Sequence, residues 1–83
     1  MDMDEDTVVS IDTTKINEAM VKETLKEVYD TLEEKGYNAT SQIVGYLLSG
    51  DLGYISSYKS ARNKMSNLDR GEVVEFLLNN YLK

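Results

Sequence analysis

The glycine-rich segment "QIVGYLLSGDLGYI", residues 42–55, is where ligand chemistry would first be sought, because it holds three of the five glycines. A phosphate-binding loop uses such glycines to present backbone amides and usually adds a lysine that contacts the phosphates. No lysine follows until Lys59, the spacing does not match a P-loop, and no strand pattern precedes the segment. Apolar residues recur at helical spacing up to Leu48, which favours a buried helix that stops at Gly50.

Catalytic and metal-binding side chains are scarce in this sequence. It contains no cysteine and no histidine, which excludes a thiolate nucleophile, a disulfide and the commonest general base and metal ligand. Carboxylate pairs such as Asp69 and Glu72 lie in polar surroundings, where a helix cap or a solvated helix face explains them. No calcium-loop spacing occurs. We therefore expect a protein that is not an enzyme and has no cofactor.

The segment "SSYKSARNK" is the one positive cluster, and residues 56–70 carry a charge of +3. A short helix, a turn and this basic helix could mimic a helix-turn-helix, so the alternative function is a nucleic-acid-binding module using Lys59, Arg62 and Lys64. However, the chain has 9 basic and 15 acidic residues, and its net charge of −6 repels nucleic acid. The favoured interpretation is that the basic face meets acidic surface of the same chain or of a dimer mate.

Residues 13–83 are predicted to form a single all-α domain, because apolar residues recur at three- and four-residue spacing and no stretch alternates with period two. We expect a compact bundle of about four short helices, over residues 15–35, from a cap at Asn38 or Thr40 to Gly50, over residues 57–68, and from Asp69 to the end of the sequence. Gly36 and Gly50 are expected to be left-handed helix stops. Gly45 costs ~1 kcal/mol relative to alanine inside a helix, so we expect it to allow another helix to approach closely.

The small size of the domain favours self-association. A chain of 83 residues buries only ~60% of the surface that its unfolded form exposes, and it has no disulfide to add stability. We therefore predict an obligate or near-obligate homodimer. Tyrosines suit such an interface because each buries a ring and keeps a hydroxyl for hydrogen bonding. The predicted contact surface consists of Ile43, Tyr46, Tyr54, Ile55 and Tyr58.

Residues 1–12 form an acidic segment with a charge of −5 and no basic residue. It has too few apolar residues to offset its ordering entropy, so we predict a mobile, disordered tail. The start of the sequence lacks the basic and apolar regions of a secretory signal. No apolar run approaches the ~20 residues of a membrane span. These features favour a cytoplasmic protein that does not insert into a membrane.

The segment "KGYNATSQIVGYLLSGDLGYISSYKSARNK", residues 35–64, resembles the IreB family of small regulatory phosphoproteins from Firmicutes. The positions that match the family pattern are Lys35, Gly36, Tyr37, Asn38, Gln42, Ile43, Val44, Gly45, Tyr46, Leu48, Ser49, Gly50, Asp51, Tyr54, Ile55, Ala61 and Arg62. Ala39 and Leu52 stand where the family usually has proline, and Gly71 stands where a better helix former is usual. We expect these departures to reduce stability without changing the fold.

The resemblance implies a cytoplasmic homodimer that is phosphorylated by a membrane-anchored Ser/Thr kinase and dephosphorylated by a cognate phosphatase. It also implies a role in cell-envelope stress, as a negative regulator of resistance to wall-active antibiotics acting on an unidentified effector. The family's acceptor segment reads "EDT" here, so the implied phosphorylation site is Thr7. A second family acceptor aligns with Asp4, so only one site carries over. We predict that Lys59, Arg62 and Lys64 receive the phosphate, on the same chain or the dimer mate; the alternative is a receiver on a partner protein.

Overall fold

The structure, a computed structural model, describes residues 18–82 and is all-α over this range, as predicted. The helices are α1 (Glu18–Glu34), α2 (Ala39–Ser49), α3 (Ala61–Ser66) and α4 (Arg70–Leu82). Two 3₁₀ turns, Leu52–Tyr54 and Tyr58–Ser60, connect α2 to α3. The predicted tail over residues 1–12 and the predicted start of the first helix before Glu18 lie outside the described residues.

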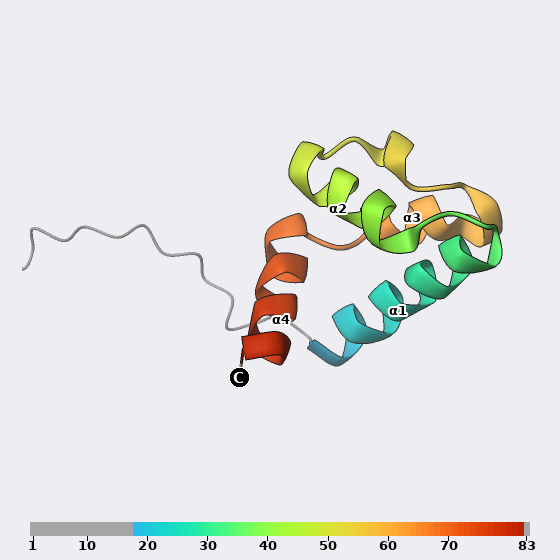
Figure 1. Ribbon diagram of the computed structural model, residues 1–83. Coiled ribbons are helices and arrows are strands. Elements are labelled where there is room, and N and C mark those ends of the chain that lie inside the picture. The colour runs from blue at the N-terminus through green and yellow to red at the C-terminus, as the bar shows by residue number, and fades with distance from the viewer. Residues whose placement is uncertain (1–17, 83) are drawn as a thin grey trace, which may run out of the picture.

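Helix α1 is the centre of the domain and contacts the three other α-helices (Figure 1). In Figure 1, α4 lies toward the N-terminal end of α1, while α2 and α3 lie along the rest of its length. The buried apolar side chains come from all four helices and from the connections after α2 and after α3. They are Val21, Val28, Leu32, Ala39, Ile43, Tyr46, Ile55, Ala61, Met65, Leu68, Val73 and Phe76.

The ends of α1 and α2 form where the sequence predicts them. Gly36 has φ 96°, and the bonds from its amide to Glu33 O and from Tyr37 N to Leu32 O close a Schellman motif. The Asn38 side chain then accepts a hydrogen bond from Ser41 N at 3.1 Å, so Asn38 rather than Thr40 caps α2. These adjacent signals turn the chain sharply, so that α2 packs back against α1.

The third predicted helix, residues 57–68, differs from the structure. The chain turns at Tyr58–Ser60, and the regular part of α3 is only Ala61–Ser66. Lys59 and Ser60 have φ of 51° and 62°, the left-handed region, which interrupts a continuous helix. This turn coincides with contacts that a straight helix does not provide, because it brings Tyr58 and Lys59 onto Glu34 of α1.

Gly45 permits a close approach, as predicted, although the neighbour is a side chain and not another helix. A Cβ atom at Gly45 would lie 2.5 Å from both Cδ1 and Cε1 of the Tyr54 ring. The ring is positioned by the 3₁₀ turn that follows α2, and the Gln42 amide donates to Tyr54 O at 2.9 Å. The glycine therefore allows the chain to fold back onto the helix that it has just left.

Candidate functional site

The basic segment that follows α2 contacts the acidic end of α1. Lys59 Nζ donates to both carboxylate oxygens of Glu34, at 3.0 and 2.9 Å, and the Tyr58 hydroxyl donates to the same carboxylate at 3.1 Å. Lys35 also contacts this tyrosine, with its Nζ 4.8 Å from the centre of the Tyr58 ring. Four side chains thus form one exposed polar cluster between α1 and the turn before α3.

The other two predicted phosphate receivers also have partners within the chain. Lys64 Nζ pairs with Glu27 Oε2 at 3.0 Å, and Arg62 Nε donates to the carbonyl oxygen of Ile55 at 2.9 Å. Both lysines therefore face acidic residues of α1, as the favoured interpretation of the basic segment predicted. Within residues 18–82, Lys59 and Lys64 are thus paired with carboxylates and Arg62 with a backbone carbonyl oxygen, which does not favour the nucleic-acid alternative. Their role as phosphate receivers stays a prediction.

The contact between Lys59 and Glu34 shifts the titration of both groups. Hydrogen bonds from Lys59, and then from Tyr58, lower the pKa of Glu34 below its ordinary value of 4.5. The hydrogen bond to Glu34 raises the pKa of Lys59 above 10.5. Both side chains are exposed, so solvent screens the attraction and the contact orients the turn more than it stabilises the fold.

Removing the Lys59 amine should return the pKa of Glu34 toward its ordinary value. Because the folded-state pKa of Glu34 is lowered, its stabilising contribution is present above pH 4.5 and is lost as the pH falls through the lowered value. We expect Lys59→Met to shift the carboxyl titration of Glu34 upward, measured from its carbon chemical shift against pH. Lys26→Met removes a lysine that pairs with Asp30 instead and should leave the Glu34 curve in place. Coincident curves for Lys59→Met and wild type would contradict the contact.

Three of the five residues predicted as a dimer surface are core residues in the structure. Ile43, Tyr46 and Ile55 belong to the buried cluster, so the prediction that they form a surface is wrong for this conformation. Only Tyr54, which is 42% exposed, and the half-buried Tyr58 remain accessible. The helical spacing indicated that these residues lie on apolar faces. It did not indicate which apolar faces are buried by other helices of the same chain.

The exposed apolar surface lies instead on α4 and the outer face of α2, a feature that the sequence reasoning missed. Only Val73 and Phe76 of α4 are buried. The exposed large apolar residues of these two helices are Val44, Leu48, Val74, Leu77, Leu78, Tyr81 and Leu82. The signal was present, because apolar residues occupy more of the α4 circumference than one neighbouring helix can cover.

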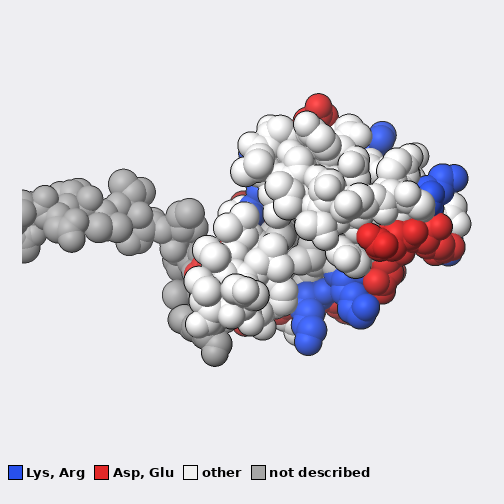
Figure 2. Space-filling view, in the orientation of Figure 1, with Lys and Arg blue, Asp and Glu red and all other residues white. Residues whose placement is uncertain are grey.

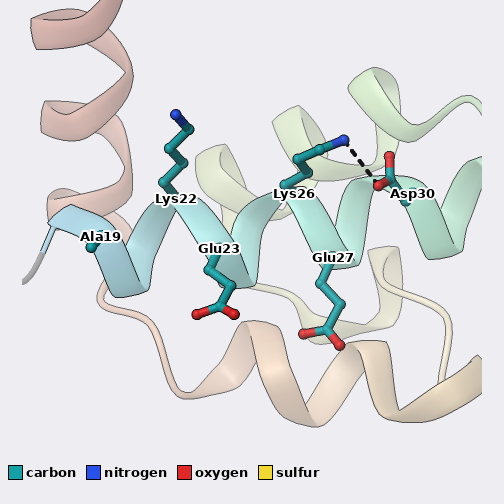
Figure 3. A pocket seen from close by; sticks show the side chains of 6 residues that line it. All are labelled: Ala19, Lys22, Glu23, Lys26, Glu27 and Asp30. Atoms are coloured by element: carbon teal, nitrogen blue, oxygen red, sulfur yellow. Dashed lines mark hydrogen bonds and ion pairs between the residues drawn. The ribbon is translucent and has the colours of Figure 1, made fainter.

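The charged face of α1 forms a broad, open depression without convergent chemistry (Figure 3). Lys22 and Lys26 project to one side of the helix, while Glu23 and Glu27 project to the other. Lys26 pairs with Asp30 at 3.1 Å, and Lys22 has no ion pair or hydrogen bond with another residue that the structure describes. Alternating charges on one helix are typical of a solvated surface. This depression does not have the shape of a catalytic or ligand pocket.

Residues 18–82 contain no group of three or more acidic side chains arranged to hold a metal ion. None of the helices in this range is both long and apolar enough to cross a bilayer. The fold and its surfaces thus define a small all-helical domain whose notable features are intramolecular ion pairs and exposed apolar side chains, as in proteins that act through contacts with other proteins. The chain belongs to the IreB family: the family model described as "IreB regulatory phosphoprotein" matches residues 5–83.

Proposed function

We propose that this protein is a non-enzymatic, cytoplasmic, homodimeric regulator of cell-envelope stress, switched by phosphorylation of Thr7. A membrane-anchored Ser/Thr kinase adds the phosphate, a cognate phosphatase removes it, and a downstream effector reads the state. The regulator lowers resistance to wall-active antibiotics. The observation that carries the proposal is the family match from residue 5, which includes Thr7 in its "EDT" context together with the helical domain.

The charge pattern supports a switch that works through binding. A phosphate adds about −1.5 to −2 charge at pH 7 to a segment that already carries −5, so repulsion from Asp4, Glu5 and Asp6 disfavours folding of that segment by itself. A cationic receiver is required. Lys59 is exposed and its pair with Glu34 is accessible to solvent, so a phosphate can compete for it. A receiver on the effector is the alternative.

Substitution of Thr7 should abolish phosphorylation. Thr7→Ala removes the acceptor hydroxyl, so incubation with the cognate membrane Ser/Thr kinase and ATP should give a phosphorylated product with wild type and none with the variant, read by intact-protein mass spectrometry. Ser10→Ala is the matched control, since it removes a hydroxyl three residues away and should leave phosphorylation unchanged. Equal phosphate incorporation into wild type and Thr7→Ala would overturn the assignment of the site.

A further inference from the structure

An apolar groove opens between α1, α2 and α4. It is lined by Leu25 and Tyr29 of α1, by Thr40, Ile43, Val44 and Leu47 of α2, and by Leu77 of α4. Its volume of about 190 Å³ is below the ~300–1,000 Å³ of typical small-molecule sites, so it suits a few apolar side chains of a peptide segment. Figure 2 shows that the surface over α2 and α4 is largely free of charged residues.

One edge of the groove carries positive charge. A second hollow adjoins the groove and shares Leu25 and Tyr29 with it, and this hollow is also lined by Lys22 and Lys26. Lys26 is paired with Asp30, whereas Lys22 has no partner among the described residues. An apolar groove beside an unpaired lysine is complementary to a segment that combines apolar side chains with acidic neighbours.

We propose that the groove binds residues 4–11 of the same chain, with Val8, Val9 and Ile11 in the groove and the acidic residues before Thr7 toward Lys22. The sequence of this segment, "DEDTVVSI", supplies both the apolar and the acidic components. The geometry allows it. Six residues, 12–17, separate Ile11 from Glu18, and the seven steps between these two Cα atoms span up to ~25 Å. Leu25 lies seven residues into α1, ~10 Å along its axis.

Covalent attachment favours this occupant over a separate molecule. A short connection raises the effective concentration of the segment at the groove to the millimolar range, so that a contact of a few apolar side chains can be populated. Occupied in this way, the groove would be closed to any partner segment of similar chemistry. The inference does not depend on phosphorylation, although Thr7 would lie next to the bound residues.

A single spin label can test this contact, because the chain has no cysteine of its own. We expect a nitroxide attached at Met3→Cys to broaden the NMR signals of Thr40, Val44 and Leu77 in the full-length protein. The serine variant V8S/V9S/I11S keeps the length and charge of the segment and should lose most of this broadening. Persistence of equal broadening in the serine variant would show that tethering or charge alone brings the label close, and would overturn the proposal.

Variants in the groove provide the reciprocal control. Val44→Glu places a negative charge on a side chain that is 46% exposed, so it should abolish the broadening without unfolding the domain. Asn63→Glu adds the same charge at an exposed position of α3 and should leave the broadening intact.

A mixed sample tests whether the bound segment comes from a second copy of the chain. It combines spin-labelled chains without isotope enrichment and isotope-enriched chains without a spin label, so any broadening must arise between two chains. Binding within one chain would be overturned if the mixture showed the same broadening as the sample in which one chain carries both the nitroxide and the isotopes. It would also be overturned if neither sample showed selective broadening. Phosphorylation of Thr7 by the kinase is measured separately, so the two proposals can fail independently.

Discussion

Replacement of Ile55 by alanine is expected to lower the free energy of unfolding by about 2–5 kcal/mol, the usual cost of truncating a fully buried aliphatic side chain. Ile55 is 0% exposed and belongs to the same buried cluster as Leu32 and Met65. It also leads from the 3₁₀ turn after α2 toward α3, and its carbonyl oxygen accepts the Arg62 hydrogen bond. The loss is large against the roughly 5–15 kcal/mol by which domains are stable.

Leu48→Ala is the matched control for this measurement. Leu48 lies on α2 and is 82% exposed, so its truncation removes little buried area and should change the unfolding free energy by less than about 0.5 kcal/mol. Urea unfolding followed by circular dichroism, at several protein concentrations, compares the two variants. Equal midpoints for Ile55→Ala and wild type would show that Ile55 is not a core residue of the folded chain.

Local signals predicted the helix ends more accurately than the helix surfaces. Gly36, Asn38 and Gly50 act through bonds with residues only a few positions away, so their sequence context is sufficient to predict them. In the same way, Glu72 N donates to Asp69 Oδ1 at 3.1 Å, which confirms the predicted cap of α4. The kink before α3 could not be read locally, because it accompanies contacts with Glu34, more than twenty residues earlier.

Which apolar face becomes core depends on tertiary contacts that a single sequence does not specify. Ile43 and Ile55 are no more apolar than Leu48 and Leu82, yet the first two are buried and the last two are exposed. The difference arises because α1 contacts α2, α3 and α4 and covers one side of each, which leaves the outer sides of α2 and α4 uncovered. The sequence therefore indicated apolar and tyrosine side chains for a contact surface, but three of the residues chosen are buried in the core, and the homodimer itself stays a prediction.

The basic segment shows a similar limit for charges. Its composition predicted positive charge near Lys59 and Lys64, and the net charge of −6 favoured a match with acidic surface. It could not identify Glu34 and Glu27 as the partners, because those pairs form only when α3 packs beside α1. To bind a phosphate, these lysines would have to release their carboxylate partners. Displacement of Glu34 from Lys59 by the phosphate is therefore the decisive step of that proposal.

Gly45→Ala is expected to destabilise the protein by about 1–3 kcal/mol, although alanine is the better helix former, because it overpacks a closed contact. The new Cβ would lie 2.5 Å from two atoms of the Tyr54 ring, a distance that forces the ring to move. The Tyr54 backbone is held by bonds from its amide to Asp51 O and from the Gln42 side chain to its carbonyl oxygen. The ring can therefore relieve the overlap only by turning toward solvent and giving up its packing on α2.

Removal of the Tyr54 ring should reverse the sign of the stability change caused by Gly45→Ala. In a Tyr54→Ala background the three atoms nearest to the new Cβ are absent, so Gly45→Ala should stabilise α2 by up to ~1 kcal/mol through helix propensity. Unfolding free energies of the two single variants, the double variant and wild type form a cycle, whose interaction energy isolates the contact between residue 45 and the ring. If Gly45→Ala stabilises the protein equally in both backgrounds, the close packing of Tyr54 on Gly45 is absent in solution. A reversal of sign would instead establish that the Tyr54 ring packs on Gly45 in solution and that a side chain at position 45 is excluded by this ring.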